Sequence, residues 1–260
     1  MILLPTVSSE WLKFRSVRST VYTLAVTVFL CVGIGALVCF AERQQWPNEG
    51  LPGHVAFDPV RTSLFGFFFA EIAIGVIGVL IMSSEYSSGS IRTTLAATPR
   101  RLSVLASKAC VLFAATIVVG EGCAFISFFI GQTVLRGVTP TATLASPGAL
   151  RAVFLGGVSL ALLALLALGI AAMLRHTAGA ITVYVSIQLV LLLIVSALPT
   201  SWNVHVLKFL PEVLTQSMRA AHSKGVQFTS FSPWISTLVL ASYAIASLVC
   251  AGWFLLRRDA

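Results

Sequence analysis

The chain has 260 residues, of which 57% are hydrophobic and only 10% are charged. Soluble domains typically carry about 25% charged residues, so this composition, with a mean hydropathy of +0.95, excludes an ordinary soluble protein and indicates a polytopic membrane protein. The net charge of +8 predicts membrane topology rather than nucleic-acid binding, because the basic residues flank apolar runs and no nucleic-acid-binding motif is present.

The N-terminal residues predict an amphipathic helix that lies in the membrane interface. Residues 1–5 have no basic region ahead of them, so we expect no cleaved signal peptide. Over residues 8–20, Trp11 and Phe14 supply an apolar face and Lys13 and Arg15 supply cations for anionic lipid. The alternative is a plain basic flank that only sets the topology.

Six apolar runs are long enough to cross a bilayer, and each predicts a helix, because backbone groups in lipid must bond within their own segment. The third run is unusually long: its 32 residues would extend about 48 Å as a helix. Its first turns therefore leave the membrane, or the helix is broken. The runs cover residues 21–40, 63–82, 104–135, 150–174, 178–198 and 234–256.

The predicted fold is an all-α polytopic membrane protein, a single transmembrane domain over residues 1–260. Lys and Arg are enriched on the side that holds both termini, with ten against seven on the other side, so we expect both termini in the cytoplasm. Residues 200–233 then form an extracellular segment before the last span. Leu207, Leu210, Leu214 and Met218 share one helical face there, which predicts a re-entrant or interfacial helical segment broken by Pro211; the alternative is a mobile loop.

The sequence carries no catalytic or metal-binding motif. It has no G-x-x-x-x-G-K-[ST] loop for ATP, no H-E-x-x-H, no G-x-S-x-G and no dinucleotide fingerprint. The five cysteines lie in apolar runs without a C-x-x-C pair, and the four histidines are scattered. We expect no enzyme activity, metal or cofactor in this chain.

Two acidic residues fall inside predicted spans, where an unpaired charge costs at least about 2.5–3.5 kcal/mol. Glu71 and Glu121 are therefore candidates for a substrate path or a proton-linked site, or for helix packing, which we favour for Glu71. Gln188 is a candidate partner, and Gly120 beside Glu121 would permit a close helix contact or a break. Phe68, within a phenylalanine-rich run, is a further candidate for the path, although such a run more often packs or faces lipid.

Residues 84–101 are a long basic interruption between the second and third apolar runs. Serine and glycine loosen its first part, and Ile91 offers an apolar anchor beside Arg92. The pattern predicts a short helix on the membrane surface, followed by a turn at Pro99 into the third span. The alternative is a basic loop that only sets topology.

This segment carries a resemblance to the ABC-2 type permease family. The matching residues are Glu85-Tyr86-x-x-Gly89-x-Ile91-Arg92-Thr93-Thr94-Leu95, then Thr98-Pro99-Arg100-Arg101 and Lys108. The stretch Glu10-Trp11-Leu12-Lys13 before the first span and the six spans also resemble the family.

The resemblance implies a permease subunit of a bacterial ABC exporter, multi-pass in the cytoplasmic membrane. It implies a homodimer or heterodimer with a second permease, and separate ABC ATPase subunits that hold ATP and Mg. Residues 84–101 would be the coupling segment that docks on the ATPase, through Glu85, Tyr86, Gly89, Ile91, Arg92 and Thr94. Residues 8–20 resemble the family's connecting helix. Substrates implied are hydrophobic or amphipathic, such as drugs, antibiotics or antimicrobial peptides, or else lipid or polysaccharide precursors.

Two other functions remain open at the level of sequence. A proton-coupled carrier or channel would use Glu121 and need no ATPase. A membrane scaffold or an intramembrane enzyme is the least supported, because no catalytic set is visible.

Overall fold

The structure is a computed structural model that describes residues 3–48, 50, 53, 57–90, 101–199, 202, 205–221 and 230–257. Every regular element in these ranges is helical, which confirms the predicted all-α class. Six helices are long and apolar enough to cross a membrane, as predicted. They run over Arg18–Asn48, Phe67–Ser87 (α6), Arg101–Leu135 (α8), Ala149–Leu174 (α9), Thr177–Ser196 and Pro233–Arg257 (α14).

The first and fifth spans are each composed of shorter pieces. The first span joins α2 (Arg18–Phe29) and α3 (Gly35–Gln45) through a π-helical turn over Leu30–Ile34, and ends in a 3₁₀ turn over Trp46–Asn48. The fifth span joins α10 (Thr177–Val185) and α11 (Leu191–Ser196) through a second π-helical turn over Ser186–Val190. Such wide turns inside long helices often mark functional positions.

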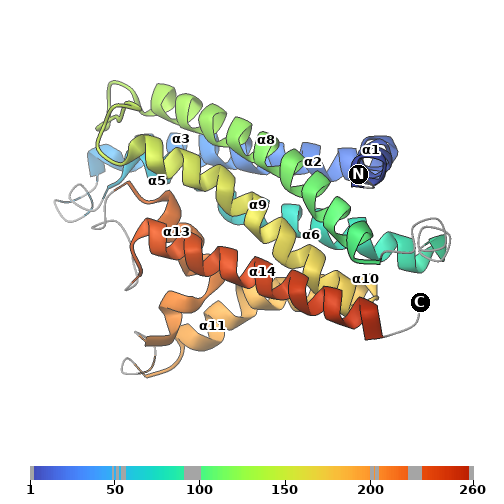
Figure 1. Ribbon diagram of the computed structural model, residues 1–260. Helices are drawn as coiled ribbons and strands as arrows, with labels where there is room; N and C mark the ends of the chain where they lie inside the picture. Colours follow the sequence, from blue (N-terminus) through green and yellow to red (C-terminus); the bar gives the residue numbers. More distant parts are fainter. Residues whose placement is uncertain are drawn as a thin grey trace.

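Helix α9 lies at the centre of the bundle and packs against α6, α8 and α14 (Figure 1). In its most apolar stretch 78% of the residues are buried, against 22% in the first and fifth spans. Small residues allow the helices to approach backbone to backbone, as is typical of membrane helix pairs. The close pairs are Gly78 with Ala164, Gly120 with Gly157, and Gly169 with Ser247.

Helix α8 is continuous over its 35 residues, about 52 Å at the usual rise. The alternative of a broken third span is therefore wrong. Gly120 lies against the backbone of Gly157 instead of interrupting the helix. Because a bilayer core is about 30 Å thick, α8 is long enough to project beyond it.

Helix α1 (Leu3–Ser16) crosses one end of the bundle, so that Figure 1 views it nearly end-on while the spans run across the picture. The extended backbone of Val17 separates it from α2. The helix thus begins before residue 8 and ends before residue 20, because residues 18–20 already belong to the first span. Helix α1, the C-terminal end of α14, the end of α6 and the start of α8 lie at the same end of the bundle (Figure 1).

At the opposite end, α5 (Pro59–Ser63) precedes α6, and α13 (Pro211–Arg219) precedes α14. The Asp58 carboxylate caps α5 by accepting from the backbone N–H groups of Val60 and Arg61. Pro211 occupies the first turn of α13, where its missing N–H is harmless, so it starts a helix instead of breaking one. All but one residue of α13 is buried, so this segment is packed into the bundle.

Candidate functional site

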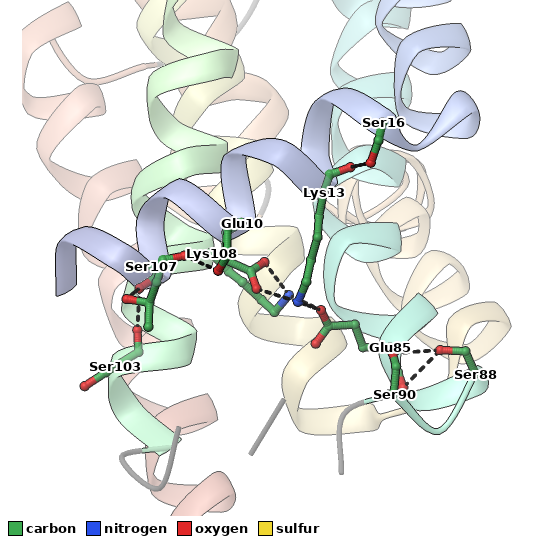
Figure 2. Close-up of polar contacts among 11 residues, drawn as sticks. Glu10, Lys13, Ser16, Glu85, Ser88, Ser90, Ser103, Ser107 and Lys108 are labelled. Carbon is green, nitrogen blue, oxygen red and sulfur yellow. Dashed lines mark hydrogen bonds and ion pairs between the residues drawn. The ribbon is translucent and has the colours of Figure 1, made fainter. Parts of the chain in front are cut away.

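A compact ion cluster forms where α1 crosses the end of α6 and the early turns of α8 (Figure 2). At its centre is Lys108 of α8, whose side chain is only 1% exposed. The Lys108 Nζ atom donates to Glu10 Oε2 of α1 at 2.7 Å and to Glu85 Oε1 of α6 at 2.7 Å. One buried ammonium group therefore joins three helices that are far apart in the sequence.

Lys13 completes the cluster from the exposed side. Its Nζ atom lies 2.8 Å from Glu10 Oε1 and 3.0 Å from Glu85 Oε1, and its side chain is 46% exposed. Glu10, Lys13, Glu85 and Lys108, called the ion cluster below, form an electrically balanced set of two carboxylates and two ammonium groups. This balance allows the charges to be buried, since an unpaired charge there would be very costly.

The ion cluster changes the acid–base properties of helix α1. Burial by itself would raise the pKa of Glu10, but Lys108 and Lys13 outweigh burial and hold it below its ordinary value of 4.5. For Lys13, partial burial lowers the pKa, while hydrogen bonds to Glu10 and Glu85 raise it above its ordinary value of 10.5. Both shifts favour the charged forms that hold the cluster together.

A second polar contact joins α1 to α8 next to the cluster. The hydroxyl oxygens of Thr6 and Ser107 lie 2.9 Å apart, and Ser107 also donates to the carbonyl of Ser103. Ser107 is fully buried, so α1 covers this part of α8.

Three of the six predicted coupling residues lie in the described part of the chain. Glu85 is 8% exposed and faces Lys108, so its carboxylate serves the ion cluster. Tyr86 is half-buried with the guanidinium of Arg175 over its ring, 5.3 Å from the ring centre. Gly89 follows the end of α6 with a φ of +71°, a conformation that favours glycine. The other three, Ile91, Arg92 and Thr94, lie outside the described residues.

Helix α6 continues through Ser87, farther than the run that ended at residue 82. The first residues of the expected surface helix, from Ser84, therefore belong to the second span instead. In this last part of α6, Glu85 is paired with Lys108 and Lys13.

The predicted interfacial residues of α1 differ in exposure, and their place at the membrane interface stays a prediction. Trp11 is 45% exposed and stacks on Phe14, with ring centres 6.0 Å apart. Arg15 is exposed, while Lys13 turns toward the ion cluster. An aromatic pair beside exposed cations is typical of headgroup depth.

Glu71 has a partner that could not be identified from the sequence. Its carboxylate accepts from the guanidinium of Arg219 in α13 and from the Thr215 hydroxyl at 3.2 Å. Arg219 also lies 3.8 Å from Glu212, whose pKa is raised well above its ordinary value by burial and by the nearby Glu71. The partners are separated by 148 positions along the chain, so no local spacing marks them.

Glu121 and Gln188 do not form the suggested pair: among the described residues, no hydrogen bond joins them. Both carboxylate oxygens of Glu121 and both amide atoms of Gln188 are buried, and none has a hydrogen-bond partner within the described part of the chain. Glu121 packs against Gly157 of α9, where a Cβ atom would lie 2.5 Å from its carboxyl carbon. Phe68 is half-buried and packs edge-on against Phe69 at 5.0 Å.

Comparison with known protein families identifies the family to which the chain belongs. The model of the family described as "ABC-2 family transporter protein" matches residues 6–191, which include the whole ion cluster. The chain therefore belongs to the ABC-2 transporter family. With its six spans, it is a multi-pass membrane protein and a transmembrane subunit of the ABC-2 type. No curated protein matches the chain.

Proposed function

We propose that the chain is the permease subunit of an ATP-driven exporter. It moves a hydrophobic or amphipathic substrate outward, powered by separate ABC ATPase subunits that hold ATP and Mg. A second permease, identical or related, completes the transporter in the bacterial cytoplasmic membrane. Lipid or polysaccharide precursors are the alternative cargo of the same kind of machine.

The observation that carries this proposal is that Glu85, at the described start of this segment, is attached to α1 and α8 through the ion cluster. A force applied to that segment by an ATPase acts on Glu85, which Lys108 and Lys13 hold against α8 and α1. Separating buried partners leaves uncompensated charge, which is strongly destabilising at about 3–5 kcal/mol. The three elements therefore move as one unit under such a force.

Under this proposal, the predicted coupling residues have two roles, positioning of the segment and contact with the ATPase. Glu85 positions the segment from inside, while Tyr86, Gly89, Ile91, Arg92 and Thr94 provide the surface for the ATPase. Arg92 is a cation next to the apolar Ile91, a combination that suits a protein groove with an acidic rim.

The test co-expresses the chain with a P-loop ATPase that co-purifies with it and measures ATP hydrolysis and export in proteoliposomes. We expect Arg92→Ala to weaken ATPase binding, and Glu85→Gln to retain binding but lose the coupling of hydrolysis to export. Ser87→Ala, an exposed neighbour of Glu85, is the matched control. Fully coupled export by both Arg92→Ala and Glu85→Gln would contradict the proposed role of this segment.

A proton-coupled carrier is the second candidate function, and the buried carboxylate of Glu121, unpartnered within the described residues, favours it. Such a carrier transports without an ATPase, driven by a pH gradient, and Glu121→Gln abolishes the activity. Transport that needs ATP and survives Glu121→Gln excludes it.

A further inference from the structure

Two buried carboxyl groups meet at the end of the bundle opposite to the ion cluster, where side chains of α13 reach the start of α6 (Figure 1). Glu71 of α6 and Glu212 of α13 are 0% and 2% exposed. Their side chains lie within hydrogen-bonding reach of each other. Because a carboxylate only accepts hydrogen bonds, a hydrogen bond between two carboxyl groups requires a proton on one of them.

A single guanidinium group contacts both acids. Arg219 donates to Glu71 Oε1, and its Nη2 atom lies 3.8 Å from Glu212 Oε1. The remaining donors are uncharged. The Thr215 hydroxyl lies 3.2 Å from Glu71 Oε2, and the Gln216 amide donates to Glu212 Oε1 at 2.9 Å. These contacts therefore supply one positive charge for two acids.

The elements packed around the pair carry other charged or titratable groups within the described part of the chain. Those groups are Cys31, Asp58, Arg61, Arg151, Tyr184, Lys208 and Tyr243. Arg61 lies near Asp58, and Arg151 donates to two backbone carbonyl oxygens. Lys208 lies over two phenylalanine rings, and Tyr184 donates to a backbone carbonyl oxygen. A second negative charge buried beside one guanidinium group would be very costly, and one bound proton removes it.

The acid–base behaviour of α13 agrees with this geometry. Burial and the nearby Glu71 raise the pKa of Glu212 well above its ordinary value of 4.5, although Arg219 opposes the shift. Two carboxyl groups that occupy one site commonly behave in this way, because only one of them ionises readily.

We propose that Glu71 and Glu212 together form a proton-binding site, in which one shared proton neutralises the charge that Arg219 does not balance. The proton adds a direct link between α6 and α13. Under the predicted topology this end of the bundle faces the outside, so the relevant pH is that of the external medium. The site uses neither Glu121 nor an ATPase, so this inference stands apart from both candidate functions.

Infrared spectroscopy tests the site directly, because a protonated carboxyl group has a carbonyl band that a carboxylate lacks. The purified chain is measured at neutral pH in a detergent without ester or carboxyl groups. We expect Glu71→Gln and Glu212→Gln each to lose the same band, because either change leaves one carboxylate for one guanidinium group. The double variant loses no more than either single variant.

The matched control is Glu10→Gln, which removes a carboxylate that its lysine partners keep ionised. This control retains the band, and all variants are compared as monodisperse samples on size exclusion. Absence of the band from the unsubstituted chain would mean that a second cation balances the acids, and overturns the proposal. A band that either Glu71→Gln or Glu212→Gln retains would mean that the proton is not shared, and also overturns it.

The pH dependence of thermal unfolding is the second readout. Because the pKa of Glu212 is raised in the folded chain, the stability that its proton contributes is complete below 4.5 and is lost as the pH rises through the folded value. We expect this loss to be absent in Glu212→Gln and retained in Glu10→Gln. A loss that persists unchanged in Glu212→Gln would assign it to other groups and overturn the proposal.

Discussion

Lys108 holds two carboxylates in a site from which solvent is nearly absent. Its side chain is 1% exposed, while the Glu10 and Glu85 side chains are 7% and 10% exposed. Lys13 contacts the same two carboxylates, but its side chain is 46% exposed. The two lysines therefore make the same contacts in very different surroundings, which allows a controlled comparison.

We predict that Lys108→Met destabilises the protein by about 3–5 kcal/mol, because it leaves buried carboxylates without their central partner. The same change at the exposed position, Lys13→Met, costs no more than about 1 kcal/mol, because solvent screens that pair. Thermal unfolding of both variants in the same detergent checks the difference. Equal losses would mean that Lys108 is not the centre of the cluster.

At the other end of the bundle, Arg219 is the counter-charge that permits Glu71 to be fully buried. We predict that Arg219→Leu destabilises the fold by about 3–5 kcal/mol. Adding Glu71→Gln recovers part of this loss, because the uncompensated carboxylate is then removed. Arg136→Leu, at an exposed position of the same side, serves as control and stays within about 0.5 kcal/mol. A double variant no more stable than Arg219→Leu would contradict this pairing.

At the scale of elements, helix α1 is held by a group that titrates in acid. The pKa of Glu10 lies below its ordinary value, so its contribution to α1 docking is complete above 4.5 and is lost as the pH falls through the lower folded value. We predict that α1 detaches reversibly in that acidic range. The fluorescence of Trp11, with the other four tryptophans replaced by phenylalanine, reports the transition. In the Glu10→Gln variant this transition should be absent; its persistence would assign it to another group.

The contact between α8 and α9 depends on a glycine that has no room for a side chain. A Cβ atom at Gly120 would lie 2.8 Å from the carbonyl oxygen of Gly157, whereas one at Gly122 would meet nothing within 4 Å. We predict that Gly120→Ala lowers the melting temperature by separating the helices. Gly122→Ala leaves it unchanged or raises it, since alanine favours the helix by up to about 1 kcal/mol. A stabilising Gly120→Ala would show that the helices separate without loss.

At the scale of the whole molecule, α8 is a single 35-residue helix that joins the ion cluster at one end to the contact with α9 in the bundle. Its first turns carry Ser107 and Lys108, which bind α1, and its middle carries Gly120 against α9. Under the proposed function, a displacement of the cluster would be transmitted along α8 into the bundle centre, because a continuous helix is stiff along its axis.

We predict that locking α1 to α8 leaves ATP-driven export intact, since the cluster already moves as one unit under the proposed function. The lock is a disulfide between Thr6→Cys and Ser107→Cys, whose hydroxyl oxygens lie 2.9 Å apart, in a chain whose five native cysteines are replaced by alanine. Export is compared before and after reduction. Export that returns only with reductant would show that α1 must move separately from α8.

Much of the fold could be predicted from the sequence, because the physics of a membrane span is local. About 20 apolar residues must form a helix in lipid, and the six predicted runs agree in number with the six helices long and apolar enough to span. The local pattern misplaces a helix end where polar residues continue the helix, as in Ser84 to Ser87 of α6. The third span could not be assigned as continuous from its length alone.

The sequence by itself determined the membrane class, the number of spans and the segments that carry the family resemblance, including Glu10, Glu85 and Lys108. Only the tertiary structure decided that these three residues meet, that Arg219 neutralises Glu71, and that Glu121 and Gln188 do not pair among the described residues. Hydrophobicity acts on each segment separately and is readable as a local pattern. Ion pairs between helices depend on how the helices rotate and pack against each other. Their partners here are 98 or 148 positions apart in the sequence, so no local sequence pattern reveals them.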